Sequence, residues 1–219
     1  ISKMQQRFVS DVSHELRTPL TTIKLAGELI YDNRENFVPP LKKSAEAMNS
    51  QIQRFETLLE DLLEISRYDA GAVAGQFEVV NLMSVVKSAI QSIEPLATKK
   101  GCEIVLETPS DNIEAEIDSR RIERLLRNLL ANAVEHGEAK PIIIAVGAGA
   151  HAVAVSVTDH GVGMTRSQLD RVFDRFWRAD PARKRTTGGT GLGLAISLED
   201  ANLHSGWLQV SAKPNEGST

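Results

Sequence analysis

The stretch FVSDVSHELRTPLTT, residues 8–22, has the apolar spacing of a helix but contains a proline, Pro19. On such a helix His14 and Thr18 would share one face, and Glu15 is adjacent to His14. Pro19 cannot donate to the carbonyl of Glu15, so we expect the helix to bend and Thr18 to leave the α region. An imidazole is a good nucleophile near neutral pH, and a neighbouring carboxylate can take its proton. The stretch therefore indicates a nucleophilic site; the alternative is a surface histidine beside an ordinary kink.

Helical patterns extend on both sides of this stretch. The first runs over residues 1–30 with a continuous apolar side. The second begins at Leu41, from which apolar residues recur at alternating steps of four and three as far as Leu62, a heptad seam widened by neighbouring leucines. Residues 31–40 (YDNRENFVPP) are polar, end in two prolines and are typical of the turn of a helical hairpin. Because two helices bury too little apolar surface, we expect two copies of the chain to form a dimeric four-helix bundle.

The pattern changes after Tyr68. The residues DAGAVAGQ are small and flexible, which indicates a linker. Beyond them helical and strand patterns alternate, which predicts an α+β domain with helices on one face of a mixed sheet. The predicted fold class is therefore multidomain, with a helical hairpin at residues 1–70, a linker at 71–81 and a second domain of the α/β sandwich kind at 82–219. In that domain we expect helices over 83–99, 119–136 and 190–203, and strands over 103–107, 113–117, 141–146, 153–159 and 207–212.

Composition excludes several classes of protein. The 219 residues have a formal net charge of −4, which does not suggest nucleic-acid binding. Cys102 is the only cysteine, so no internal disulfide can form. The longest apolar tract, residues 142–157, is too short and too interrupted to span a bilayer. The chain begins at Ile1 without a methionine, so we expect it to be an excised part of a longer protein.

Two glycine-rich segments form a second candidate site. DHGVG, residues 159–163, follows a predicted strand, and GGTGLGL, residues 188–194, opens a predicted helix. Glycines let the backbone approach phosphates closely, and a helix N-terminus favours anions. The spacing is not that of a Walker loop or a dinucleotide-binding fingerprint, so the phosphate site would be of another type. The alternative is an ordinary pair of turns.

Two further patterns accompany the glycines. In RNLLANAVEH, residues 127–136, Asn128 and Asn132 share one helical face, and a hydrated magnesium ion with phosphates would satisfy them. Helix-surface polarity is the alternative. In FDRFWR, residues 173–178, an aromatic pair is followed by a basic, glycine-ended loop, which would suit a mobile cover over a polyphosphate. The alternative is a core anchor followed by a solvated run of charges.

Taken together, these motifs resemble those of the sensor histidine kinases. SHELRTPL is similar to the phosphoacceptor motif of that family, NLLANA to its asparagine box, DHGVG and GTGLGL to its two glycine boxes, and FDRFW to its phenylalanine box. The motifs occur in the family order over nearly the whole chain. The wording of residues 7–22 and of FETLLEDLLEIS further resembles the actinobacterial MtrB type. The resemblance implies the cytoplasmic catalytic portion of a cell-membrane sensor protein.

The resemblance also implies a role for each site residue. His14 would accept a phosphoryl group from ATP, Glu15 would be its general base, and Thr18 would position water in a reverse phosphatase reaction. Asp159 would bind the adenine amino group, while Asn128 and Asn132 would hold Mg²⁺ and phosphate oxygens. The remaining nucleotide-binding residues would be Gly161, Gly163, Arg175, Arg178, Gly189, Thr190, Gly191, Leu192 and Gly193.

The implied cofactors are ATP and Mg²⁺. The implied partners are a second copy of the chain in a homodimer and the receiver domain of a response regulator, which would take the phosphoryl group on an aspartate. No nucleic acid is implied, and the membrane would be reached only through segments absent from this chain. The related ATPases have a water-activating glutamate where Asn128 stands, which favours transfer to a histidine over hydrolysis. A nucleotide-hydrolysing machine and a pseudokinase scaffold are the alternatives.

Overall fold

The computed structural model describes residues 3–179 and 189–219, and their side chains from residue 15 onwards. The chain divides into two units, Ile1–Ala74 with Asp180–Leu192, and Gly75–Ala179 with Gly193–Thr219. We call them the helical unit and the α/β unit. Within the described ranges, none of the helices is both long enough and apolar enough to cross a lipid bilayer.

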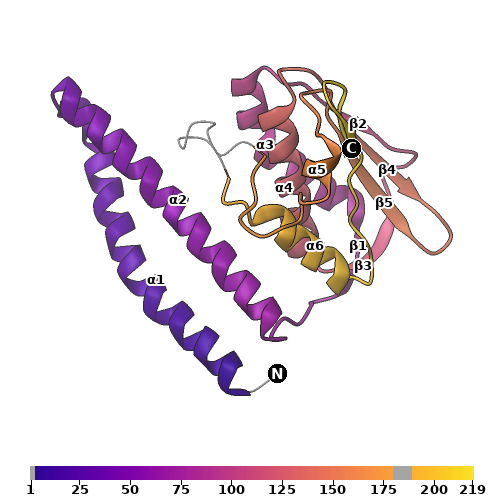
Figure 1. Ribbon diagram of the computed structural model, residues 1–219, viewed down its shortest axis with the longest axis horizontal. Helices are drawn as coiled ribbons and strands as arrows, with labels where there is room; N and C mark the ends of the chain where they lie inside the picture. The colour runs from indigo at the N-terminus through magenta and orange to yellow at the C-terminus, as the bar shows by residue number, and fades with distance from the viewer. Residues whose placement is uncertain (1–2, 180–188) are drawn as a thin grey trace. The chain divides into compact units, whose positions relative to one another are not determined.

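The helical unit contains the predicted hairpin. Helix α1 (Lys3–Asp32) is followed by the 3-10 turn η1 (Arg34–Asn36) and by helix α2 (Pro39–Asp69), and the two long helices lie side by side (Figure 1). Val38 has an extended backbone and precedes two prolines in the first turn of α2, where the backbone N–H groups need no intrahelical partner. The prolines therefore end the turn and begin the helix.

The contact between α1 and α2 leaves much apolar surface uncovered. Leu20, Leu59 and Leu63 form its buried cluster, and Lys24 Nζ donates to Glu56 Oε1 at 2.9 Å across the two helices. Other large apolar side chains of the hairpin are exposed, among them Leu16, Ile23, Leu25, Leu29, Leu41, Phe55 and Leu62. A single hairpin therefore does not bury its own apolar surface, as the heptad pattern predicts.

The structure corrects one expectation at Pro19. Helix α1 continues through the proline and Thr18 stays helical. Only the bond to the Glu15 carbonyl has to be lost there, while the next residues bond back, Thr21 Oγ1 to the Arg17 carbonyl at 2.9 Å and Thr22 Oγ1 to the Thr18 carbonyl at 3.3 Å. The preference of a residue before proline for extended backbone is thus outweighed by the long helix around it.

The α/β unit has helices over one layer and strands in another (Figure 1). Three strands form a mixed sheet in the order β2-β4-β5, in which β4 is parallel to β2 and antiparallel to β5. Strand β1 pairs with β3, and β6 with β7. The elements in chain order are β1 (Glu78–Asn81), α3 (Leu82–Lys100), β2 (Ile104–Glu107), β3 (Glu114–Ile117), α4 (Ser119–His136), β4 (Ile142–Ala148), β5 (Val153–Thr158), α5 (Arg166–Leu169), α6 (Gly193–Leu203), β6 (Ala212–Lys213) and β7 (Gly217–Ser218).

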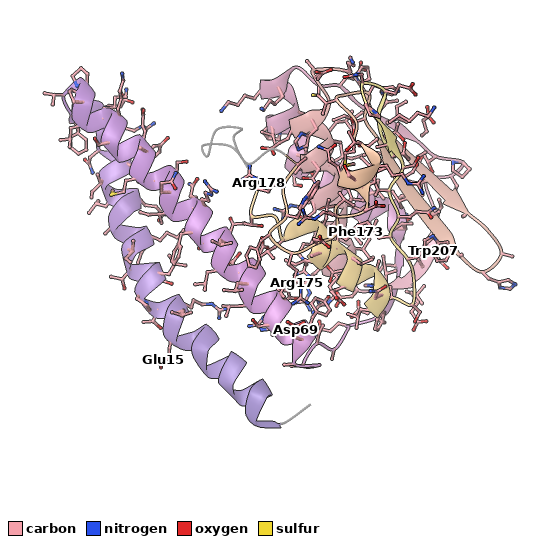
Figure 2. All side chains as sticks on the ribbon, viewed as in Figure 1. Glu15, Asp69, Phe173, Arg175, Arg178 and Trp207 are labelled. Carbon is pink, nitrogen blue, oxygen red and sulfur yellow. The ribbon has the colours of Figure 1, made fainter. Side chains whose placement is uncertain are left out.

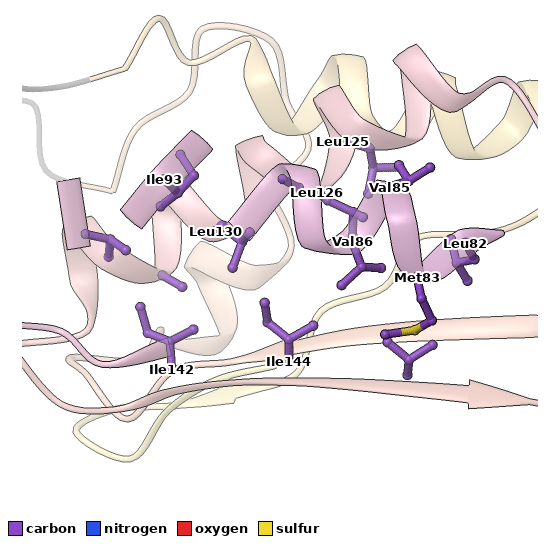
Figure 3. Close-up of a cluster of buried hydrophobic side chains, with 14 of the residues drawn as sticks. Leu82, Met83, Val85, Val86, Ile93, Leu125, Leu126, Leu130, Ile142 and Ile144 are labelled. Atoms are coloured by element: carbon purple, nitrogen blue, oxygen red, sulfur yellow. The ribbon is translucent and has the colours of Figure 1, made fainter. Parts of the chain in front are cut away.

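The main core lies between the helices and the sheet (Figure 3). Ile142, Ile144 and Val146 alternate along β4, each no more than 5% exposed, and point to the helices. Leu126 and Leu130 meet them from α4. This packing confirms the predicted class, a helical hairpin followed by an α/β unit whose helices cover a mixed sheet.

Three boundaries differ from the expected ones. The strand expected over 207–212 is a ladder of only Ala212–Lys213 with Gly217–Ser218, continued by two backbone bonds between Ser211 and Thr219. The alternating pattern is present, but in the described chain residues 207–210 have no ladder partner. Helix α6 begins at Gly193 because Gly191 has a left-handed φ of 74°, which an α-helix cannot contain. Strand β1 lies inside the segment predicted as linker.

Candidate functional site

Asp159 lies at the end of β5 and is 5% exposed. Its Oδ1 accepts a hydrogen bond from the backbone N–H of Gly161 at 2.9 Å. Its Oδ2 accepts one from the hydroxyl of Ser218. Two backbone hydrogen bonds, of 2.8 and 3.1 Å, join Asp159 and Ser218. The carboxylate is therefore held in one orientation from both sides, and each oxygen keeps a second lone pair with which to accept a hydrogen bond.

The glycines of DHGVG allow backbones to approach closely. A Cβ on Gly161 would lie 1.8 Å from the carbonyl oxygen of His136, the last residue of α4. Gly163 has a φ of +60°, and a Cβ there would lie 1.8 Å from the Lys213 carbonyl oxygen. Both positions therefore require glycine. The predicted loop lies against the end of α4, the helix that contains the two asparagines.

Asn128 projects from α4 onto the start of α6. Its Nδ2 donates to the Gly193 carbonyl at 3.2 Å and contacts the Ser197 hydroxyl at 3.3 Å. With the amide nitrogen used in this way, the Oδ1 atom is the one that can serve a cation or a donor. Asn132 is one turn further along the same helix and is half-buried. The structure thus brings Asn128 and Gly193, the last glycine of the second glycine segment, together.

The glycine segment is divided between the two units. Gly189–Leu192 belongs to the helical unit, where Thr190 Oγ1 donates to Asp61 Oδ2 at 2.6 Å and accepts from the Leu192 backbone N–H at 3.2 Å. Leu192 is fully buried, whereas a Cβ on Gly189 would meet nothing within 4 Å. Of the basic loop predicted as a cover, residues 179–189, residues 180–188 lie outside the described part of the chain.

Arg175 and Arg178 lie on the segment that follows α5 (Figure 2). Arg175 is exposed and Arg178 is half-buried. The two phenylalanines of FDRFW differ in burial, because Phe173 is half-buried while Phe176 is 58% exposed with a φ of 62°. A left-handed residue turns its side chain away from the direction that the three-residue spacing assumes.

The predicted phosphoacceptor residues all lie on α1 of the helical unit. Glu15 (Figure 2) and Thr18 are exposed, and the helical backbone places Thr18 one turn after His14. The side chain of His14 lies outside the described part of the structure. The predicted phosphoacceptor residues are therefore on a different unit from Asn128, Asn132 and Asp159, whereas Gly189–Leu192 belong to the same unit as α1.

The donor set suits only one kind of metal site. Among the residues whose side chains are described, no three His, Cys, Asp or Glu side chains come close enough to hold an ion. Any cation beside Asn128 would bind amide oxygens, together with water and oxygens of a ligand. That set fits Mg²⁺, which prefers oxygen ligands and keeps several of its waters.

Two groups of residues were missed by the sequence analysis. Ser218 was missed because its partner Asp159 is distant in the chain; the signal, a hydroxyl residue after Gly217, is weak. The second group is a buried ionic cluster formed by Arg121 and Arg124 of α4 with Asp200 of α6. An aspartate among the apolar residues of a helix (AISLEDANL) is the signal that identifies it.

Family models match both units. Residues 4–71 match HisKA, the His Kinase A (phospho-acceptor) domain, and residues 117–219 match HATPase_c, the histidine kinase-, DNA gyrase B- and HSP90-like ATPase. The sensor histidine kinase MtrB of Mycobacterium tuberculosis (strain ATCC 25618 / H37Rv) is 52% identical over 215 residues, 98% of this chain and 38% of that protein. The sensor histidine kinase YkoH of Bacillus subtilis (strain 168) is 35% identical, over 98% of this chain and 46% of that protein.

Solved structures agree with these matches. Full-length ShkA in complex with AMPPNP has a TM-score of 0.81 and 26% sequence identity, over 97% of this chain and 44% of that one. The catalytic domain of histidine kinase ThkA has a TM-score of 0.57 and 25% identity, over 65% of this chain and 91% of that one. The chain spans less than half the length of the curated relatives named above, and the predicted resemblance to the MtrB type is confirmed.

Proposed function

The chain belongs to the sensor histidine kinase family, and from this premise we propose that ATP phosphorylates His14 and that the group then passes to an aspartate of a response regulator. The chain would be the cytoplasmic catalytic portion of a cell-membrane sensor, with the membrane reached only through segments outside it. No nucleic acid takes part, in keeping with the net charge of −4.

The single observation that carries this proposal is the amide of Asn128 on the Gly193 carbonyl, 3.2 Å away. An amide at this position cannot remove a proton from water, unlike the glutamate of the related hydrolases. Water at the γ-phosphoryl group would therefore find no general base at this position, which favours transfer to a better nucleophile. The HisKA match over residues 4–71 includes SHELRTPL, which opposes a hydrolase in which that motif is incidental.

The transfer step uses residues of α1. A nitrogen of the His14 imidazole forms a bond to the γ-phosphorus of ATP, while the bond from that phosphorus to the bridging oxygen breaks and ADP leaves with the electron pair. Glu15 accepts the proton that the imidazole loses. Thr18, exposed one turn later, would orient a water in the reverse, phosphatase reaction on the regulator.

The adenine end of the nucleotide binds at Asp159. The exocyclic amine donates to the carboxylate, whose direction is fixed by Gly161 and Ser218. A site built around such a hydrogen bond rejects a base that presents a carbonyl there, because two acceptors would then face one another. Ser218 is therefore a further residue of the adenine site.

The phosphate end binds along α4, beside Asn128 and Gly193. Mg²⁺ supplies charge neutralisation for the β- and γ-phosphates when it is bound. Asn128 and Asn132 would hold the ion through their amide oxygens. The backbone of Gly189, Thr190, Gly191, Leu192 and Gly193 would contribute N–H groups to the phosphates. Gly161 and Gly163 would shape the pocket, and Arg175 or Arg178 would contribute positive charge.

The working form is a homodimer. HisKA domains dimerise, and the exposed apolar side chains of α1 and α2 provide the surface for a four-helix bundle. The receiver domain of the regulator then docks near His14.

A single-turnover experiment tests the proposed activity against simple hydrolysis. Purified protein in excess over γ-labelled ATP with Mg²⁺ is quenched in alkali, and the label is divided between protein and free phosphate. We expect most of the label on protein at early times, in a bond that survives alkali and is lost in acid. Label that is released only as free phosphate would show a hydrolase.

A further inference from the structure

Asp200 is a fully buried carboxylate in the middle of the α/β unit. Arg124 of α4 holds it through two guanidinium nitrogens, with Nε 3.0 Å from Oδ2 and Nη2 2.6 and 2.7 Å from the two carboxylate oxygens. Arg121 adds a contact from Nη1 to Oδ1 at 3.1 Å. A guanidinium held at two points by a carboxylate has little freedom to rotate or slide.

The cluster is balanced in charge. Asp118, at the N-cap of α4, lies 3.5 Å from Arg121, so that two arginines face two carboxylates. All four side chains are at most 32% exposed, and the two carboxylates at most 3%. Buried ion pairs of this kind rarely add net stability over apolar packing, because desolvation offsets the attraction. Their best-attested use is to fix which groups lie opposite one another.

Here the groups that the cluster aligns are those of the nucleotide site. Along α4, Asn128 is one turn after Arg124, and along α6, Ser197 is one turn before Asp200. Two sets of contacts, one helical turn apart, therefore join the same two helices. Arg124 contacts Asp200 in the first, and Asn128 contacts Ser197 and Gly193 in the second. A shift of α6 by one turn would break the contact between Arg124 and Asp200 and move Gly193 away from Asn128.

The C-terminal end of α6 is joined to the N-terminal end of α4 through His204. His204 Nδ1 contacts the Asp200 carbonyl at 2.7 Å, and its Nε2 accepts from the Asp118 backbone N–H at 3.0 Å. Since Nε2 accepts, Nδ1 must donate. The N-cap of α4 and the end of α6 are thus joined directly, which prevents α6 from tilting away when the side chains at its start bind a ligand.

We propose that Asp200, held by Arg121 and Arg124, is a positioning residue that sets the register of α6 on α4 and so places Gly193 against Asn128 for the metal-bound phosphates of the nucleotide. The proposal rests on the proposed function. It concerns the phosphate end, because Asp159 of the adenine end is held by Gly161 and Ser218 and the cluster acts on the contact between α4 and α6.

The test separates the two ends of the nucleotide. Calorimetry measures the affinity of the dimeric chain for ATP with Mg²⁺ and for ADP with a chelator, and the ratio of the two affinities reports the metal-phosphate contribution. We expect Asp200→Asn to lower this ratio by about tenfold or more while the affinity for metal-free ADP stays within about twofold. Asp111→Asn is the matched control, because it removes an exposed carboxylate of the same unit, paired with Lys87 at 2.8 Å.

A second variant distinguishes a loss of the alignment of the two helices from a loss of folding. Replacing Arg124 and Asp200 together by leucine removes one charge of each sign and leaves Arg121 paired with Asp118, and exchanging a buried ion pair for apolar groups is often neutral or stabilising. We expect this variant to melt near the wild-type temperature yet to keep the lowered ratio. A ratio that returns to the wild-type value together with stability, or an unchanged ratio in Asp200→Asn, would overturn the proposal. Wild-type protein that binds no ATP would instead overturn the proposed function.

Discussion

The amide nitrogen of Asn128 lies 3.2 Å from the carbonyl oxygen of Gly193, so the middle of α4 meets the first residue of α6. The pair joins two motifs that are 65 residues apart in the chain. The contact fixes which atom of the amide is left for a ligand, and that atom is an oxygen. A Cβ on Gly193 would lie 3.4 Å from Asn128 Cγ, in van der Waals contact with the amide.

Replacing Asn128 by aspartate should weaken Mg-ATP binding. A carboxylate cannot donate to the Gly193 carbonyl, so two oxygens would face one another at the distance that a hydrogen bond now occupies. We expect the binding free energy of Mg-ATP to become less favourable by about 2 kcal/mol or more, the cost of removing a partly buried hydrogen bond and adding repulsion. Calorimetry measures the loss. Asn202→Asp, an exposed asparagine on α6, should bind like the wild type; a similar loss there would point to net charge.

Replacing Asp159 by asparagine should weaken ATP binding and reduce the preference for adenine over guanine. The amide retains one acceptor but places an N–H group where the carboxylate now accepts from Gly161 or Ser218. Competition between ATP and GTP, followed by calorimetry, measures both effects. Ser218→Ala should show the same direction with a smaller change. Unaltered affinity and selectivity in Asp159→Asn would remove this residue from the adenine site.

Replacing Thr18 by alanine should spare autophosphorylation and slow dephosphorylation of the regulator. The side chain is exposed, and the Thr22 hydroxyl bonds only to the backbone carbonyl of Thr18, which alanine also provides. The helix should therefore persist. The measurement is the lifetime of the phosphorylated regulator with ADP and each protein. Thr57→Ala, an exposed threonine of α2, is the control. Wild-type decay with Thr18→Ala would contradict the role, and so would loss of both activities.

The stability of the α/β unit should fall in acid partly through Asp118. Burial opposes ionisation of this carboxyl, but hydrogen bonds from the backbones of Gln76 and Arg121 and the nearby arginine charges outweigh it, so its pKa is below the ordinary value of 3.8. A lowered pKa in the folded state stabilises the fold above that ordinary value. The contribution is therefore lost as pH falls below about 4 towards the folded pKa.

The variant Asp118→Asn isolates this effect. It cannot titrate, so its unfolding free energy should be lower than that of the wild type at neutral pH and should decline less steeply below about pH 4. Urea titrations at a series of pH values measure both slopes. Parallel curves for the two proteins would contradict the lowered pKa. Glu114→Gln, an exposed carboxylate on β3, should give the wild-type slope.

Local signals in the sequence were sufficient for most elements. Asp118 and Asn81 cap their helices through side-chain bonds to the backbone of Arg121 and Met83, as residues of these types do. The heptad spacing and the two prolines fixed the hairpin. The features that were missed depend on partners distant in the chain. Asp200 and Arg124 are 76 residues apart, and Ser218 and Asp159 are 59 apart.

The errors at the ends of elements have the same origin. Residues 207–210 alternate as a strand should, but a strand exists only beside a partner, and periodicity does not report where the partner lies. Helix α6 starts after Gly191 because the φ of this glycine is positive. Glycine permits such a φ but does not require it, so the residue type alone does not locate the start of the helix. At Pro19 the preference of the preceding residue for extended backbone is outweighed by the helix. The preference concerns one residue, whereas the helix continues on both sides of the proline.

The central claim is that His14 receives the γ-phosphoryl group of ATP. The most direct measurement is mass spectrometry of the wild type and of His14→Ala after incubation with Mg-ATP, digested and analysed under alkaline conditions that preserve phosphohistidine. We predict one phosphorylated peptide in the wild type, with the group on His14, and none in the variant, which should still bind ATP because Asp159 and Asn128 are on the other unit. Phosphate on another residue of the variant, or an unphosphorylated His14 in active wild-type protein, would contradict the account.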